Sequence, residues 1–147
     1  MTQDNIRAHI EMIRERIAKA AERAGRDANQ VTVLGACKTV ETERVLQAIA
    51  LGISHVGENQ VQEAETKFKD LARPDHLASL HLIGHLQTNK VRRAVALFDV
   101  IQTVDSIRLA ERINNIAREL NRHIPIYIQV NVGLEPTKEG VRPDQVR

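Results

Sequence analysis

The sequence predicts an α/β fold in which helices cover a parallel sheet. Helix-like and strand-like segments alternate along the 147 residues, and the strand-like segments are short and apolar, as in sheets buried on both faces. Expected strands begin near positions 31, 55, 80, 100 and 126, a repeat of about 24 residues. Such alternation occurs in doubly wound sheets and in (β/α)8 barrels.

The first element is an amphipathic helix. Isoleucines recur at three- and four-residue steps from Ile6 to Ile17, which is the spacing of one helical face. Asp4 stands where a cap begins a helix, and Gly25 where a helix ends. The run VTVLGA at 31–36 then predicts a short, fully buried strand.

The same alternation continues to the end of the chain. Ser106 is expected to cap the helix that runs to about Leu120, and Pro143 stands in the tolerated first turn of one further helix. The remaining expected helices span residues 42–51, 60–71 and 87–98, and the remaining strands span residues 55–58, 80–83, 100–103 and 126–132.

The length of the chain favours a (β/α)8 barrel that is interrupted after its fifth strand. At the observed repeat, a barrel of eight units needs roughly 220 residues, so this chain is three units short. We expect residues 1–147 to be a single barrel domain, incomplete at its C-terminal side, with an N-terminal helix and about five βα units. We prefer this interpretation to a natural five-strand domain.

Composition excludes several classes of protein. Apolar residues make up 42% and charged residues 27%, the balance of a soluble globular protein. No run of 18 apolar residues and no secretory leader pattern occur, so we expect a cytoplasmic protein without a membrane partner. A net charge of +2 and three aromatic side chains, two Phe and one Tyr, argue against a nucleic-acid partner.

Lys38 is the leading candidate for a site residue. Successive side chains of a strand alternate between its faces, so Lys38 shares a face with Leu34 and Ala36, whereas Cys37 points to the helices. Lys38 follows the carboxyl end of the first strand, where barrels build their active sites. Burial there would favour the neutral amine that forms a Schiff base. A surface lysine is the commoner occupant of such a position.

Polar residues near other strand ends are expected to join Lys38. Asn59 follows the second strand and His81 lies on the third, while Gln129 and Asn131 lie on the fifth. Buried strands are usually apolar throughout, so polar residues there indicate a polar interior. We expect these side chains to converge on one mouth of the barrel.

Several motifs, in order, resemble the YggS/PROSC family of pyridoxal phosphate homeostasis proteins. They cover essentially the whole chain: ACKTV at 36–40, GEN at 57–59 with VQE at 61–63, HLIGHLQTNK at 81–90, VDS at 104–106, and QVNV at 129–132 followed by Glu135, Lys138 and Gly140.

The resemblance implies a barrel like that of alanine racemase, with pyridoxal 5′-phosphate (PLP) held as an aldimine on Lys38. It also implies that Asn59 and His81 line the cofactor pocket. The family stores, delivers or regulates PLP in vitamin B6 and amino-acid balance, without an established turnover. Its phosphate-binding segments fall in a C-terminal part missing here, so we expect exposed barrel edges that favour an oligomer.

Other functions are less favoured. A PLP-dependent amino-acid racemase needs a second residue for proton transfer, and the single tyrosine, Tyr127, falls within the fifth strand. A Schiff-base aldolase ranks last, because no proton shuttle is evident. His81 and His85 have the spacing of a helical zinc pair but fall on a strand and a turn, without an evident third ligand. We therefore expect no metal site.

Overall fold

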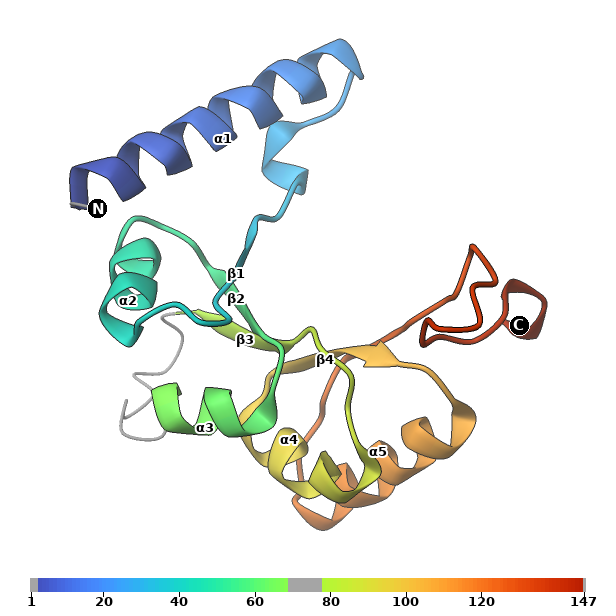
Figure 1. The fold of residues 1–147 in the computed structure, drawn as a ribbon. Coiled ribbons are helices and arrows are strands. Elements are labelled where there is room, and N and C mark those ends of the chain that lie inside the picture. The colour runs from blue at the N-terminus through green and yellow to red at the C-terminus, as the bar shows by residue number, and fades with distance from the viewer. Residues whose placement is uncertain (1–2, 69–77, 147) are drawn as a thin grey trace.

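The chain folds into one parallel sheet of five strands flanked by helices (Figure 1). The computed structural model describes residues 3–68 and 78–146. The strands are β1 (Leu34–Ala36), β2 (His55–Glu58), β3 (Ser79–Leu82), β4 (Val100–Val104) and β5 (Ile126–Ile128). The α-helices are α1 (Gln3–Arg23), α2 (Thr42–Ala50), α3 (Val61–Phe68), α4 (Val91–Leu97) and α5 (Ile107–Glu119). Short 3-10 helices are η1 (Ala28–Gln30), η2 (Thr88–Lys90) and η3 (Pro143–Gln145).

Strand order follows chain order, which confirms the predicted α/β class. Every neighbouring pair is parallel, so all five carboxyl ends meet at one edge of the sheet. Ala36 pairs with Gly57, and Gly57 pairs with His81. These three residues therefore form one row on a single face of the sheet, which we call the inner face.

The opposite face of the sheet packs against the helices. Phe98, Leu82, Ile101 and Ile116 are among the largest fully buried side chains there, and α4 contacts α5. Ser106 caps α5 as predicted, because its side chain accepts a hydrogen bond from the Leu109 N–H at 3.3 Å.

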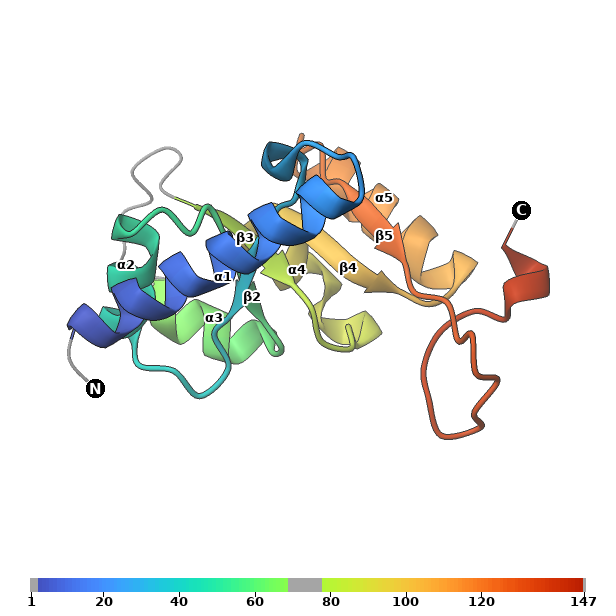
Figure 2. The same cartoon turned by 90° about the horizontal axis from the view of Figure 1, so that it is seen from above.

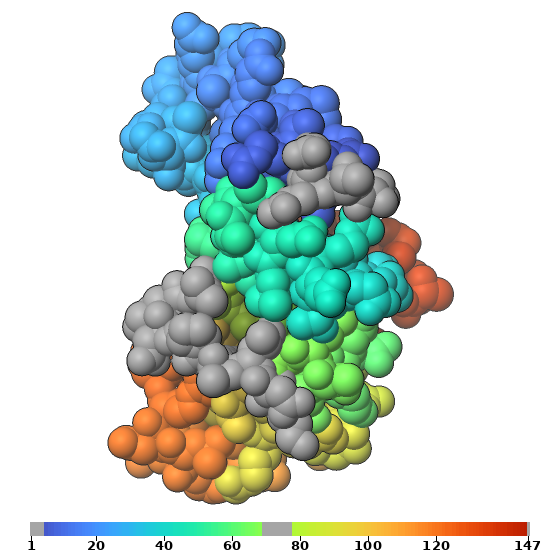
Figure 3. Space-filling model, turned by 90° about the vertical axis from the view of Figure 1, so that its left-hand side faces the viewer, coloured from blue at the N-terminus to red at the C-terminus, as the bar shows by residue number. Residues whose placement is uncertain are grey.

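The N-terminal segment that contains α1 and η1 forms a lobe at one end of the molecule (Figure 3). Arg14 ties α1 to the chain after α2 by donating to the carbonyl oxygens of Leu51 and Gly52 at 3.2 and 3.0 Å. The helix already begins at Gln3, so the predicted cap at Asp4 is wrong. Gly25 follows the helix with a φ of +63°, a conformation that glycine adopts without strain.

The two edge strands are shorter and more open than predicted. Residues 28–30 form η1, in which Asp27 accepts from the Asn29 N–H, and Val31 is 40% exposed. The prediction of a fully buried strand from 31 to 36 is therefore wrong. In the described sheet β1 pairs only with β2, so one of its edges is uncovered. All three residues of β5 are exposed. The segment after β5 extends away from the helices (Figures 1 and 2).

The other helix limits differ from the sequence prediction by a few residues. Helix α3 is described from 61 to 68, and the predicted part at 69–71 lies outside the described residues. The predicted helix at 87–98 is divided into η2 and α4. Pro143 begins η3, a single short turn. In the described ranges, no helix combines the length and the apolar character needed to cross a membrane.

Candidate functional site

Lys38 lies just beyond the carboxyl end of β1, as its position in the sequence predicts. Ala36 ends the strand, and the alternation places the buried Cys37 in the core among the apolar side chains. Lys38 itself is exposed, so its predicted burial is wrong. The physical reason is the open inner face beside it, since Ala36, two residues earlier on the same face, is exposed as well.

Asn59 follows β2 directly and is half-buried. It lines a pocket with Gln60, Gly84 and Lys90, at the same sheet edge as Lys38. The loops after β2 and β3 touch here, because a Cβ added to Gly84 would collide with the carbonyl oxygen of Asn59. Glycine at position 84 is therefore required by the close approach of the two backbones.

His81 lies on the inner face of β3 and is 6% exposed. Its Nε2 is 2.9 Å from His55 Nδ1, and its Nδ1 is 2.8 Å from Gln102 Nε2. The amide nitrogen of Gln102 donates, so His81 Nδ1 accepts and the neutral His81 carries its proton on Nε2. That proton is donated to His55. Both ring nitrogens of His81 are thus occupied by protein groups.

Electrostatics favour the neutral form of His81. Burial lowers the pKa of His81, and the neighbouring His55 lowers it further, while Asp99 acts in the opposite direction. A second positive charge on two adjoining imidazoles would cost Coulomb energy in a poorly solvated place. The inner face below Lys38 therefore carries a hydrogen-bonded imidazole, His81, that resists protonation.

Gln129 and Asn131 do not point into a barrel mouth, so this part of the prediction is wrong. Strand β5 already ends at Ile128, and both side chains stabilise the loop that follows. Gln129 Nε2 donates to the carbonyl oxygen of Glu139 at 3.1 Å. Asn131 Nδ2 donates to the carbonyl oxygens of Glu135 and Lys138 at 2.9 and 3.2 Å.

A buried ionic network next to Lys38 escaped the sequence prediction. Lys67 Nζ of α3 lies 2.9 Å from Glu58 Oε1 and 2.9 Å from Glu63 Oε1. Glu58 is completely buried, although it lies on a strand where an apolar residue is the rule. Two features of the sequence could have indicated this network. One is the charged Glu58 on a buried strand, and the other is the i, i+4 spacing of Glu63 and Lys67.

The three charges affect one another's protonation. Burial raises the pKa of Glu58, against the hydrogen bond from Lys67. The hydrogen bond from Lys67 lowers the pKa of Glu63, and the Thr39 N–H lowers it further. Burial disfavours the charge of Lys67, but its bonds to Glu63 and Glu58 prevail and raise the pKa of the ammonium.

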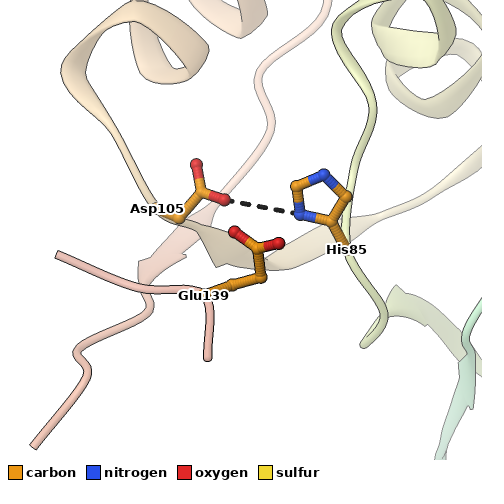
Figure 4. Close-up of side chains that lie close together, drawn as sticks. All are labelled: His85, Asp105 and Glu139. Carbon is orange, nitrogen blue, oxygen red and sulfur yellow. Dashed lines mark ion pairs between the residues drawn. The ribbon is translucent and has the colours of Figure 1, made fainter. Parts of the chain in front are cut away.

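His81 and His85 do not form a pair in space, since His81 belongs to β3 and His85 to the loop after it. His85 Nδ1 instead lies 3.4 Å from Asp105 Oδ2. Glu139 completes a group of three whose ligand atoms lie within 4.8 Å of one another (Figure 4). No sequence pattern indicated Glu139 as a neighbour of His85. His85 and Glu139 are exposed, and exposed groups of this kind commonly lie together without a metal ion.

The lowered pKa of His81 predicts a pH dependence of stability. As pH falls from about 7.5 to about 5, unfolded His81 gains a proton at its ordinary pKa of about 6.5, whereas folded His81 resists it. The free energy of unfolding should therefore decrease on acidification, by about 1.4 kcal/mol for each unit of pKa shift. Urea titrations across this range measure the slope.

Substituting His81→Gln should remove this part of the slope, and His9→Gln on the exposed side of α1 should leave it intact. Identical slopes for His81→Gln and the unsubstituted chain would contradict the assignment of the slope to His81.

Several known proteins resemble this chain over most of its length. A pyridoxal phosphate homeostasis protein of Aquifex aeolicus (strain VF5) is 40% identical over 138 residues, which are 94% of this chain and 60% of the relative. The crystal structure of an unknown protein from Bifidobacterium adolescentis superposes with a TM-score of 0.88 at 34% identity, covering 97% of this chain and 61% of that one.

PipY of Synechococcus elongatus PCC7942, solved with PLP bound, superposes with a TM-score of 0.68 at 36% identity, covering 87% of this chain and 57% of PipY. The chain thus spans about 60% of the length of the curated relatives it matches. These relatives confirm the resemblance to the PLP homeostasis proteins. Residues 8–147 match the protein family described as "Alanine racemase, N-terminal domain", and the chain belongs to that family.

Proposed function

We propose that residues 1–147 form a single PLP-binding barrel domain whose Lys38 holds the cofactor as an aldimine. The role is storage, delivery or regulation of PLP for vitamin B6 and amino-acid balance, in the cytoplasm and without catalytic turnover. The observation that carries the proposal is the position of Lys38 at the carboxyl end of β1. The family relationship and the PLP bound to PipY support it.

The residues at this edge suit the aldehyde of PLP. In the described part of the chain, no hydrogen bond or ion pair occupies the amine of Lys38, which is exposed and can be reached from solvent. Lys67, by contrast, is occupied by three acceptors. An amine must be accessible to condense with an aldehyde, so Lys38 is the better candidate of the two.

Asn59 and His81 are proposed to line the cofactor pocket in different ways. Asn59 lies at the carboxyl edge of β2, two residues beyond Gly57, and Gly57 pairs with Ala36. Lys38 is likewise two residues beyond Ala36, so Lys38 and Asn59 occupy equivalent levels on adjacent strands. His81 lies one level lower and has both ring nitrogens occupied, so it would contact the cofactor through its ring.

A carrier suits this site better than an enzyme. A racemase needs two proton-transferring groups, one on each side of the substrate. Tyr127 is the only tyrosine of the chain, and it is 60% exposed on β5. The alternative function, a PLP-dependent amino-acid racemase, would need its second proton-transferring group from elsewhere.

Lys38→Ala is expected to abolish the visible absorbance that appears when PLP is added to the unsubstituted chain, because alanine has no amine to form the imine. Lys19→Ala, on the exposed side of α1, should retain the absorbance. Reduction with borohydride followed by peptide mass analysis should locate the label on Lys38. Undiminished absorbance in Lys38→Ala would refute the proposed site.

Incubation with L-alanine and PLP distinguishes the carrier from the racemase. A carrier leaves the L-enantiomer unchanged, whereas a racemase produces D-alanine at a rate above that of free PLP. Chiral chromatography after prolonged incubation measures the product. Accumulation of D-alanine that depends on Lys38 would favour the racemase.

We also propose that the chain associates through the exposed edge at β5. Tyr127 is 60%, Ile128 57% and Val132 81% exposed, and an apolar strand edge favours pairing with another strand. Light scattering should detect an oligomer, and Ile128→Lys should shift it toward the monomer. A monomer at all concentrations would refute the association.

A further inference from the structure

We propose that Glu63 and Lys67 of α3 are positioning residues for Lys38, because they hold the backbone immediately before and after it. This inference rests on the proposed function of Lys38 as the PLP-binding lysine. We call Glu63 and Lys67, together with their partner Glu58 of β2, the α3 clasp. In the described chain no hydrogen bond joins the clasp to the amine of Lys38, although the charges of Glu63 and Lys38 attract each other. The clasp holds Lys38 through the backbone on either side of it.

The first half of the clasp holds the residue before Lys38. Lys67 Nζ donates to the carbonyl oxygen of Cys37 at 2.6 Å, in addition to Glu58 and Glu63. An ammonium group has three N–H donors, so all of them are used. The side chain is only 11% exposed, where such charge-assisted bonds are strong.

The second half holds the residue after Lys38. Glu63 Oε1 accepts the backbone N–H of Thr39 at 2.7 Å. Thr39 has a φ of +59°, which is unfavourable for a β-branched residue. Such strain persists where surrounding contacts impose it, and it concentrates at functional sites. The clasp therefore fixes Lys38 between two anchored peptide groups, one of them in a strained conformation.

Stability alone gives a poor account of this arrangement. Glu58 is completely buried, and within the described chain its Oε2 has no hydrogen-bond partner. Buried ion pairs are often no more stable than apolar residues of similar size. A costly network that ends on the two peptide groups beside Lys38 is better explained by the need to hold those groups in place.

The clasp also selects which lysine reacts. Lys67 and Lys38 both lie near the carboxyl end of β1, but the bonds to Glu63 and Glu58 keep Lys67 protonated. An amine attacks an aldehyde only after its ammonium form has lost a proton, and three acceptors hold the protons of Lys67. Lys67 thereby fixes the loop and is itself removed as a competitor for the cofactor.

Glu63→Ala in the full 147-residue chain tests the proposal, because Glu63 is partly exposed and its loss leaves the Lys67–Glu58 pair intact. The apparent dissociation constant for PLP, measured by imine absorbance, should rise about tenfold to a hundredfold, the effect of one charge-assisted hydrogen bond. Glu63→Gln retains an acceptor for the Thr39 N–H and should recover part of the affinity. Glu65→Ala, on the same helix but paired with Arg93, is the matched control and should bind PLP normally.

Two further readouts separate positioning from general stability. Hydrogen exchange of the amides at 38–40 should accelerate in Glu63→Ala, while the amides of β3 and β4 keep their protection. After borohydride reduction, the label should spread from Lys38 to other lysines. Unchanged affinity and unchanged labelling in Glu63→Ala, with the unsubstituted chain labelled at Lys38, would overturn the clasp and leave the proposed function standing. Imine formation that survives in Lys38→Ala would overturn both.

Discussion

Parallel pairing of the strands in chain order is the constraint on which the rest of the structure depends. It brings every carboxyl end to one edge of the sheet, so residues far apart in sequence meet there. The register then sets their levels: Ala36, Gly57 and His81 form one row. Lys38 and Asn59 each follow that row by two residues on their own strands. The site is therefore a consequence of the register, and any slip would turn its residues to the other face.

The two faces of this sheet have different physical characters. Apolar side chains fill the space between the sheet and the helices, and no hydrogen bonds are needed there. The inner face carries a polar network, in which His81 is satisfied on both nitrogens by His55 and Gln102. Glu58 is the exception, because it is a carboxylate in the apolar layer. Its partner Lys67 extends the network from that layer to the loop that carries Lys38.

The sequence predicted the order of elements well, since hydrophobic periodicity and a cap such as Ser106 are local signals. It also placed Lys38 and Cys37 on opposite sides of the chain, because alternation in a strand is local as well. Burial was predicted poorly at the edges. Whether Val31, Ile128 or Lys38 is covered depends on which strands lie beside it, and that is a property of the whole sheet. The bonds of Gln129 and Asn131 to their own loop escaped prediction for another reason: the predicted strand continued to residue 132, whereas β5 ends at Ile128.

The exposure of Lys38 changes how its proposed reactivity is explained. A buried lysine is activated by desolvation, but an exposed one gains its advantage from being held in place. Fixing a reacting group before it meets its partner removes an entropy cost from the reaction. The α3 clasp supplies this fixation through two peptide groups, and the strained φ of Thr39 shows that the loop is held against its own preference. Under the proposed function, selectivity for Lys38 over Lys67 then follows from geometry and hydrogen bonding.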